Sequence, residues 1–370
     1  MDAKQYEDVI RFCATDAPWM NIMSYGHSGI GKTAIPKQIA AELGIPYIHL
    51  DATGMEPSDL IGLPFKEEMI AADGKTKEMV TRFLPPRFLK AMEQSPNGIF
   101  IMDEVTRLDL QVRNTWMQFL SEGTLGEVKR PLGTDEKSGK PTGWLVVQTA
   151  NPADEGYQVT DLDIALVRRS IVLELGYDLE VWRDWAAGKY RSRGGQPISA
   201  RVIAAAGRMN KGLVKPIKNK IMQTLTPDGL RVCSELVEVG IMDKMDRDTA
   251  LAVLSGAAGS EAALAIYQSL NDKRLQELLD QAMKGEKVKF GGNDHDVAVD
   301  LLYVFWEKVA KNAKKYAKEI TNLYHCLPED IRIALIKACY SNFAKHREEF
   351  QELAKEWREW CTKNALAQGR

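Results

Sequence analysis

The chain reads G-H-S-G-I-G-K-T over residues 26–33, and this glycine loop decides the fold. The spacing G-x-x-x-x-G-K-T is that of a loop whose backbone N–H groups surround phosphate oxygens. Lys32 is expected to reach the β- and γ-phosphates of ATP, and the Thr33 hydroxyl is expected to ligate Mg²⁺. The residues expected to bind ATP are the loop and the start of the following helix, namely Gly26, His27, Ser28, Gly29, Ile30, Gly31, Lys32, Thr33 and Ala34.

The segments on both sides of this loop predict a parallel α/β sheet. Residues 19–25 form an apolar run that leads into the loop, residues 33–43 have helical spacing, and residues 47–51 are again strand-like. A strand–loop–helix–strand order opens the sheet of a P-loop NTPase. Further strands are expected at 98–102, 144–149 and 170–175, and further helices at 4–14, 86–94 and 110–122.

Beyond residue 178 the strand signals fade and helical periodicity replaces them. The prediction is therefore an α/β core followed by an all-helical lid and a helical extension. The expected divisions are an α/β nucleotide-binding domain at 1–178, a lid at 179–245 and an extension at 246–370. Inside the first domain, residues 63–83 are interpreted as an insertion with a hairpin turn at Asp73-Gly74, and residues 123–143 as a long hairpin.

A second motif, I-F-I-M-D-E over residues 99–104, is an apolar strand that ends in two carboxylates. A buried strand of this kind delivers acids to the carboxyl edge of the sheet, where ligands bind in open α/β folds. Asp103 is expected to hold Mg²⁺ through water, and Glu104 to act as the general base for the attacking water. The pair favours hydrolysis of ATP over phosphorylation of a small molecule.

Two polar positions further along the chain complete the predicted site. Asn151 follows the strand 144–149 in the motif Q-T-A-N-P and is expected to orient the water or contact the γ-phosphate. Arg168 and Arg169 precede the last strand, and one of them, preferably Arg169, is expected to reach the γ-phosphate bound by a neighbouring subunit.

The series GHSGIGKT, DLIGLP, IFIMDEVTRLD, QTANP and LDIALVRR, in this order, resembles the AAA+ ATPases, and within them the MoxR branch of the helix-2-insert clade. The resemblance covers about residues 1–175. It implies that 63–83 is the helix-2 insert and 123–143 the pre-sensor-1 hairpin, both projecting toward a client or a pore. It also implies a homo-oligomeric, hexameric ring and a protein client, often with a von Willebrand A domain.

The resemblance leaves two arginine roles open. The family's sensor 2 arginine is expected near the start of a lid helix, where the sequence has Asp228; Arg231 lies one helical turn further on, and Arg201 is the competitor. Arg107 matches the basic residue that follows the acidic pair in the family. It is expected either to contact the neighbouring subunit or to restrain Glu104, with a plain surface role as the alternative.

Bulk properties narrow the class of protein. The 370 residues are 45% hydrophobic with a formal net charge of −2, which gives no general argument for nucleic-acid binding. The five cysteines show no paired spacing, which is typical of reduced thiols. No apolar run approaches the roughly 20 residues of a membrane span, and no signal peptide is recognisable. We expect a cytoplasmic protein without membrane contact.

The leading hypothesis is a ring-forming ATP hydrolase that remodels or activates a partner protein in a chaperone-like, MoxR-type manner. The alternative is a nucleic-acid-associated AAA+ motor or loader. Its contacts would be the basic hairpin residues Lys129, Arg130, Lys137 and Lys140, and the C-terminal lysines Lys308, Lys311, Lys314, Lys315 and Lys318. A solvated helix face is the competing interpretation of these C-terminal lysines.

Overall fold

The structure is a computed structural model, and it divides into two compact units, Met1–Asp178 and Leu179–Arg370. Each unit is described by itself. The residues described are 1–70, 75–152, 163–188, 198–207, 209, 225–291, 294–329, 331–332, 335, 350, 353–355 and 358. The turn expected at Asp73-Gly74 lies outside them.

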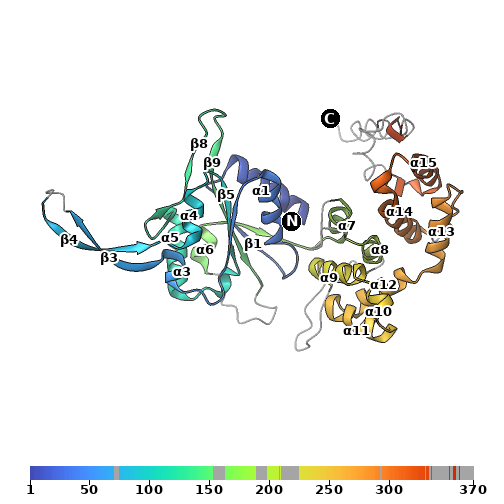
Figure 1. The fold of residues 1–370 in the computed structure, drawn as a ribbon, viewed down its shortest axis with the longest axis horizontal. Coiled ribbons are helices and arrows are strands. Elements are labelled where there is room, and N and C mark those ends of the chain that lie inside the picture. The colour runs from blue at the N-terminus through green and yellow to red at the C-terminus, as the bar shows by residue number, and fades with distance from the viewer. Residues whose placement is uncertain are drawn as a thin grey trace. The chain divides into compact units, whose positions relative to one another are not determined.

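The first unit is built on a parallel sheet with the strand order β10-β1-β9-β5-β2 (Figure 1). Its strands are β1 (Asn21–Tyr25), β2 (Tyr47–Asp51), β5 (Gly98–Asp103), β9 (Pro141–Ala150) and β10 (Ile171–Glu174). Helices cover both faces, which is the α/β class that the sequence predicts. Each expected strand of the core is present, with bounds that differ by at most three residues at either end.

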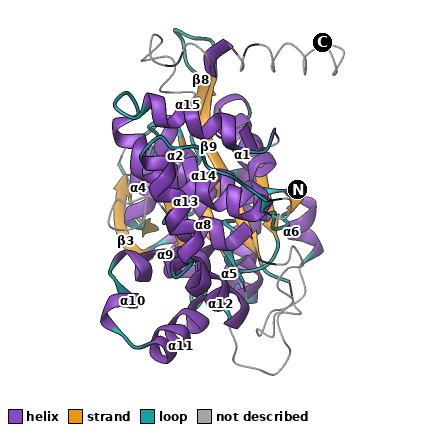
Figure 2. Cartoon of the chain, turned by 90° about the vertical axis from the view of Figure 1, so that its right-hand side faces the viewer, coloured by secondary structure: helices purple, strands orange, loops and turns teal. Residues whose placement is uncertain are grey.

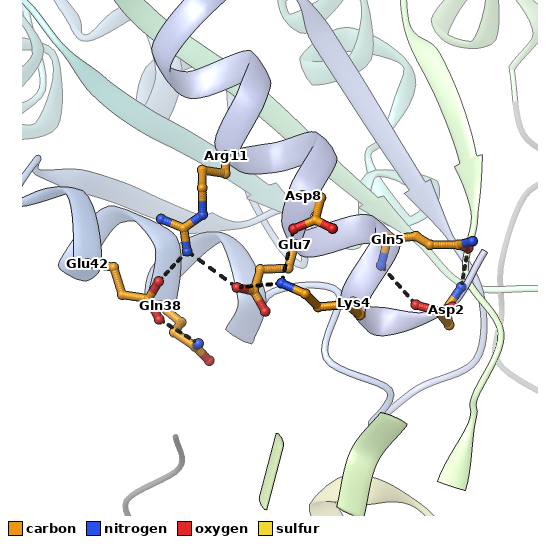
Figure 3. A network of polar contacts seen from close by, with 8 residues as sticks. All are labelled: Asp2, Lys4, Gln5, Glu7, Asp8, Arg11, Gln38 and Glu42. Carbon is orange, nitrogen blue, oxygen red and sulfur yellow. Dashed lines mark hydrogen bonds and ion pairs between the residues drawn. The ribbon is translucent and has the colours of Figure 1, made fainter. Parts of the chain in front are cut away.

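One face of the sheet is covered by α1 (Ala3–Asp16) and α2 (Ala34–Leu43), the helix that follows the glycine loop. Helix α2 ends at Gly44, whose φ of 67° is a left-handed cap. Arg11 of α1 forms ion pairs with Glu7 of the same helix and with Glu42 of α2 (Figure 3). These contacts join α1 to the helix that carries the loop.

The other face packs against shorter helices and one long helix, with a core that includes Phe100, Trp116 and Val146. Alternate residues of β9 point to this face and to the α1–α2 face. The helices are α3 (Pro57–Ile61), α4 (Arg87–Glu93), α5 (Leu110–Glu122) and α6 (Ile164–Arg168). A short 3-10 helix, η1 (Val105–Arg107), follows β5.

Three antiparallel strand pairs add to this core. Strands β3 (Leu63–Ile70) and β4 (Lys77–Leu84) pair antiparallel, as expected for residues 63–83, and Figure 1 shows them extending away from the rest of the unit. The stretch 123–143 is not one long hairpin. It forms β6 (Thr124–Leu125) with β7 (Val128–Lys129), and then β8 (Leu132–Thr134), which pairs with the start of β9.

The described residues of the second unit form helices joined by loops, with no strand among them, and these helices are drawn in purple in Figure 2. Ala200 of α8 shares a buried core with residues of the later helices α13, α14 and α15, so segments on both sides of residue 245 belong to this unit. The helices are α7 (Leu179–Gly188), α8 (Ala200–Gly207), α9 (Pro227–Glu238), α10 (Ile241–Lys244), α11 (Arg247–Ala258), α12 (Ser260–Leu270), α13 (Lys273–Met283), α14 (His295–Val309), the 3-10 turn η3 (Ala310–Asn312) and α15 (Ala317–Cys326).

Candidate nucleotide-binding site

The glycine loop lies between the end of β1 and the start of α2, at the carboxyl edge of the parallel sheet. Gly29 and Gly31 have φ of 75° and 102°, which residues with a Cβ rarely adopt. A Cβ on Gly26 would lie 2.6 Å from the carbonyl oxygen of Leu175. The backbone therefore needs glycine at these positions to fold into a loop that can surround a phosphate.

Lys32 is folded into its own loop. Its ammonium donates hydrogen bonds to the carbonyl oxygens of Gly26 and His27, both at 2.6 Å, and the residue is only 6% exposed. From α1, the buried Tyr6 hydroxyl contacts the Lys32 carbonyl at 3.2 Å. The loop thus places a cation at its centre, where it can meet the charge of a nucleotide's terminal phosphates.

Thr33 occupies the N-cap position of α2, yet its hydroxyl makes no capping hydrogen bond. It lies instead 2.9 Å from both carboxylate oxygens of Asp103. A threonine at this position normally caps the helix. The Thr33 hydroxyl contacts an acid of the sheet instead, which indicates a role in a binding site rather than in capping the helix.

Asp103 ends β5 and is the centre of a small polar cluster. Its carboxylate accepts hydrogen bonds from Thr33 and Thr149 and lies 3.2 Å from Nε2 of His49. Burial by itself would raise the pKa of Asp103, but the hydrogen bonds from His49, Thr149 and Thr33 outweigh burial and lower the pKa to about 2. The carboxylate is therefore charged at neutral pH.

The donor set of this cluster fits a magnesium ion. Mg²⁺ prefers oxygen ligands, usually one or two from the protein, with waters and phosphates completing the octahedron. Thr33 supplies a hydroxyl and Asp103 a charged carboxylate at hydrogen-bonding distance from each other. These are the two residues that the sequence predicts for the metal.

Glu104 has φ 56° and ψ 45°, the one positive φ of a non-glycine residue among the described residues. Such a backbone costs about 1–3 kcal/mol and persists only where its surroundings impose it. The Glu104 amide donates to the Thr149 hydroxyl at 3.0 Å, and its carboxylate lies 2.6 Å from Nε of Arg107. Thr53 Oγ1 lies 3.4 Å from the same carboxylate.

The remaining predicted residues of the first unit divide between the two edges of the sheet. Asn151 is 7% exposed and directly follows β9, whose last residue Ala150 accepts a hydrogen bond from the amide of Gly26. Arg169 is at the opposite, amino edge, where its carbonyl accepts a hydrogen bond from Asn21 at the start of β1. Its guanidinium is exposed and contacts Ser121 Oγ at 2.6 Å. Arg168 beside it is also exposed.

The two sensor 2 candidates belong to the second unit, where each contacts residues of its own unit. Arg231 forms ion pairs with Asp228 at 2.9 Å and Glu235 at 2.7 Å. Arg201 donates to the carbonyl oxygen of Ser269 and to Gln276. The choice between them stays a prediction.

Sequence reasoning missed Thr149 and His49. Thr149 lies in the motif Q-T-A-N-P, but the motif points to Asn151, two residues further on. His49 lies on β2, and strand pairing aligns it with Ile101, two residues before Asp103. Their contacts with Asp103 depend on which strands are neighbours, and spacing along the chain does not reveal that order.

One residue of the basic hairpin is in the core. Arg130 is 4% exposed, and it donates to the carbonyl oxygens of Trp144, Pro18 and Met20 and to the side chain of Asn21. Burial lowers the pKa of this guanidinium to about 10. The expectation that Arg130 contacts nucleic acid is therefore wrong, whereas Lys129, Lys137 and Lys140 are exposed.

Among the described residues, no helix is both long and apolar enough to cross a bilayer.

No curated protein sequence matches the chain significantly. Three solved structures show distant likeness. The Thermotoga maritima RuvB P216G mutant has 12% identity and a TM-score of 0.32, over 83% of this chain and 80% of that one. The Thermotoga maritima RuvB Holliday junction branch migration motor has 13% identity and a TM-score of 0.36, over 85% of each chain.

The third is Brucella abortus NtrX in complex with ADP, with 14% identity and a TM-score of 0.37, over 91% of this chain and 67% of that one. The family model that matches is that of the AAA domain, dynein-related subfamily, over residues 21–170. That range holds the glycine loop, the Asp103 cluster and Arg169. Residues 21–170 are thus similar to the AAA domain of the dynein-related subfamily.

Proposed function

We propose that this chain hydrolyses ATP in a ring of identical subunits and uses the cycle to remodel a partner protein in the manner of the MoxR branch. The observation that carries the proposal is the division of the site between the two edges of the sheet. Lys32, Asp103 and Glu104 lie at the carboxyl edge, and Arg169 lies at the amino edge. A strand of five residues separates them by about 16 Å.

At that distance the Arg169 guanidinium cannot readily reach a nucleotide in the glycine loop of its own subunit. It is better placed to reach the nucleotide bound by another subunit. Arg169 is exposed and follows α6, so its guanidinium is available to a neighbour packed against the amino edge. In such a ring each site would be completed by the next subunit, with hydrolysis tied to assembly. A closed hexamer satisfies this requirement for every site.

Within one site the roles follow from the contacts. Lys32 would exchange its bonds with Gly26 and His27 for oxygens of the β- and γ-phosphates. Mg²⁺, held by Thr33 and through water by Asp103, would neutralise charge on those phosphates when bound. Glu104 would leave Arg107 and take a proton from the attacking water, which Asn151 would help to orient.

The experiment that tests the shared site is subunit mixing. Glu104→Gln removes the base but keeps Arg169, whereas Arg169→Ala keeps the base. Each variant alone is expected to hydrolyse ATP about 100-fold or more slowly than the wild type. Mixed in equal amounts, they are expected to regain turnover well above the sum of the two, because some Arg169→Ala sites then have an intact neighbour. A mixture no faster than its components would reject the shared site.

The nucleic-acid alternative loses support from Arg130, whose side chain is buried among backbone carbonyls. The discriminating measurement is ATP turnover with single-stranded or duplex polynucleotide at increasing salt, since phosphate contacts weaken steeply with salt. We expect turnover within about twofold of the basal rate. Strong, salt-sensitive stimulation would favour a motor or loader. It would count against the remodelling of a protein client and against a partner with a von Willebrand A domain.

A further inference from the structure

Gln148 is a polar residue in the apolar interior of the first unit. It lies in β9 and is 0% exposed, on the face where Val146 and Ala150 pack into the core. Burying an amide is costly unless it is hydrogen-bonded. Both ends of this side chain are bonded, because Nε2 donates to Ser170 Oγ and Oε1 accepts from Trp116 Nε1, each at 2.7 Å.

The bond to Ser170 fixes the segment that carries Arg169. Ser170 directly follows Arg169, and its hydroxyl also contacts the carbonyl oxygen of Leu166 in α6 at 3.1 Å. The side-chain amide of Asn21 donates to the carbonyl oxygen of Arg169, the residue before Ser170, at 3.1 Å. The backbone directly after the Arg169 side chain is thus held by two contacts with the sheet, and one of them is the Gln148 amide.

The next residue of the same strand, Thr149, contacts the acids of the subunit's own nucleotide site. Thr149 points to the opposite face, where its hydroxyl donates to Asp103 and accepts from the amide of Glu104. Gln148 and Thr149 are adjacent in the chain, so one piece of β9 contacts both the acids of the subunit's own site and the arginine segment.

We propose that Gln148 is a positioning residue that sets Arg169 for the active site of the neighbouring subunit. The proposal rests on the shared site proposed above. Gln148 does not touch the nucleotide; it acts through Ser170 and the turn between α6 and β10. A displacement of about 1 Å in a group that stabilises the transition state can cost about 100-fold in rate. Loss of this anchor should therefore impair the neighbour's site and spare the subunit's own.

The test is subunit mixing with Gln148→Met, which keeps the length of the side chain and removes both the donor and the acceptor of its amide. Alone, this variant is expected to lose about 10- to 100-fold in kcat with nucleotide affinity within about twofold of wild type. Titration with Glu104→Gln subunits should raise turnover per Gln148→Met subunit, since the added neighbours bring a correctly held Arg169. Turnover per Gln148→Met subunit that stays constant or falls would overturn the proposal.

Two further variants separate positioning from a general loss of packing. Ser170→Ala removes the partner hydroxyl and leaves Gln148 intact, so the same rescue is expected, with a smaller initial loss. Ser24→Ala is the matched control, because the Ser24 hydroxyl bonds the backbone carbonyl of Gln148 at 3.0 Å and not its side chain. It should show no rescue by Glu104→Gln subunits. Equal rescue of Ser24→Ala would also count against the proposal.

The Arg169→Ala mixture is the reference that separates this inference from the proposed function. If Arg169→Ala is rescued and folded Gln148→Met is not, the shared site stands and the role of Gln148 is wrong. If neither is rescued, the shared site itself fails. Should Gln148→Met not fold, Ser170→Ala decides by the same criterion.

Discussion

The hydroxyl of Thr149 accepts a hydrogen bond from the backbone amide of Glu104 at 3.0 Å. The same hydroxyl donates to the carboxylate of Asp103. One side chain on β9 thereby fixes both acids at the end of β5, the one expected to hold the metal and the one expected to act as base. Glu104 adopts its left-handed backbone at this contact.

Thr149→Val tests this relationship, because valine keeps the shape and removes the hydroxyl. The Glu104 amide would lose its partner in a partly buried position, which costs about 1–3 kcal/mol of unfolding free energy. We expect that loss in urea unfolding, together with a kcat lower by roughly 10- to 100-fold and little change in ATP affinity. Thr142→Val, at the start of the same strand, should leave kcat unchanged. A wild-type kcat for Thr149→Val would show that the hydroxyl does not place the acids.

The left-handed backbone of Glu104 predicts that the residue at this position affects stability through backbone strain. Asparagine tolerates this conformation better than other non-glycine residues. Glu104→Asn should therefore unfold at higher free energy than Glu104→Gln by about 0.5–1 kcal/mol. Both variants should bind ATP and hydrolyse it very slowly, since neither has a carboxylate base. Chemical denaturation measures the difference, and equal stabilities would contradict a strain at this position.

Lys32→Met should weaken ATP binding by roughly 10- to 100-fold, because a hydrogen bond to a charged group contributes about 1.5–3 kcal/mol. Titration with a fluorescent ATP analogue measures this change. Lys90→Met removes an exposed lysine of α4 and serves as the control, with affinity expected at the wild-type value. If Lys32→Met binds as tightly as Lys90→Met, the loop does not bind phosphate through Lys32.

Arg130→Met should destabilise the first unit strongly. The guanidinium satisfies buried acceptors on the segment before β1 and on β9, including the carbonyl oxygens of Pro18 and Trp144. Leaving several of them without a donor should lower the unfolding free energy by about 3 kcal/mol or more. The adjacent, exposed Lys129→Met should change it by less than about 0.5 kcal/mol. Thermal unfolding compares the two, and equal effects would refute the structural role.

Cysteine reactivity tests the core of the second unit. Cys233 is buried in α9, and burial raises the pKa of its thiol to about 12. At pH 8 only about one molecule in 10⁴ would carry the reactive thiolate. Peptide mass spectrometry after iodoacetamide treatment should find Cys233 unmodified in the folded protein and the partly exposed Cys326 modified much faster than Cys233. In urea both should react, so fast labelling of Cys233 in the folded state would contradict this packing.

Much of the fold followed from local sequence. The strand around Asn21–Tyr25, the loop with Lys32 and the helix that ends at Gly44 are each specified by apolar periodicity and by glycines at special backbone positions. The pair Asp103 and Glu104 could be predicted because an apolar strand delivers its next residues to the carboxyl edge. These features depend on residues close together in the sequence, so they can be predicted without knowing how distant segments pack.

The tertiary structure decided which residues surround those motifs. Thr149 and His49 reach Asp103 only because β9 and β2 flank β5, and strand order is fixed by how the two cores pack, not by spacing along the chain. For the same reason Arg130, a surface residue by composition, proved to be a buried donor. In the sequence Gln148 is a polar residue in an apolar strand without an evident role, and only the fold brings Ser170 and Trp116 to the two ends of its amide. A buried polar group is explained by its partners, and in a parallel sheet those partners come from distant parts of the chain.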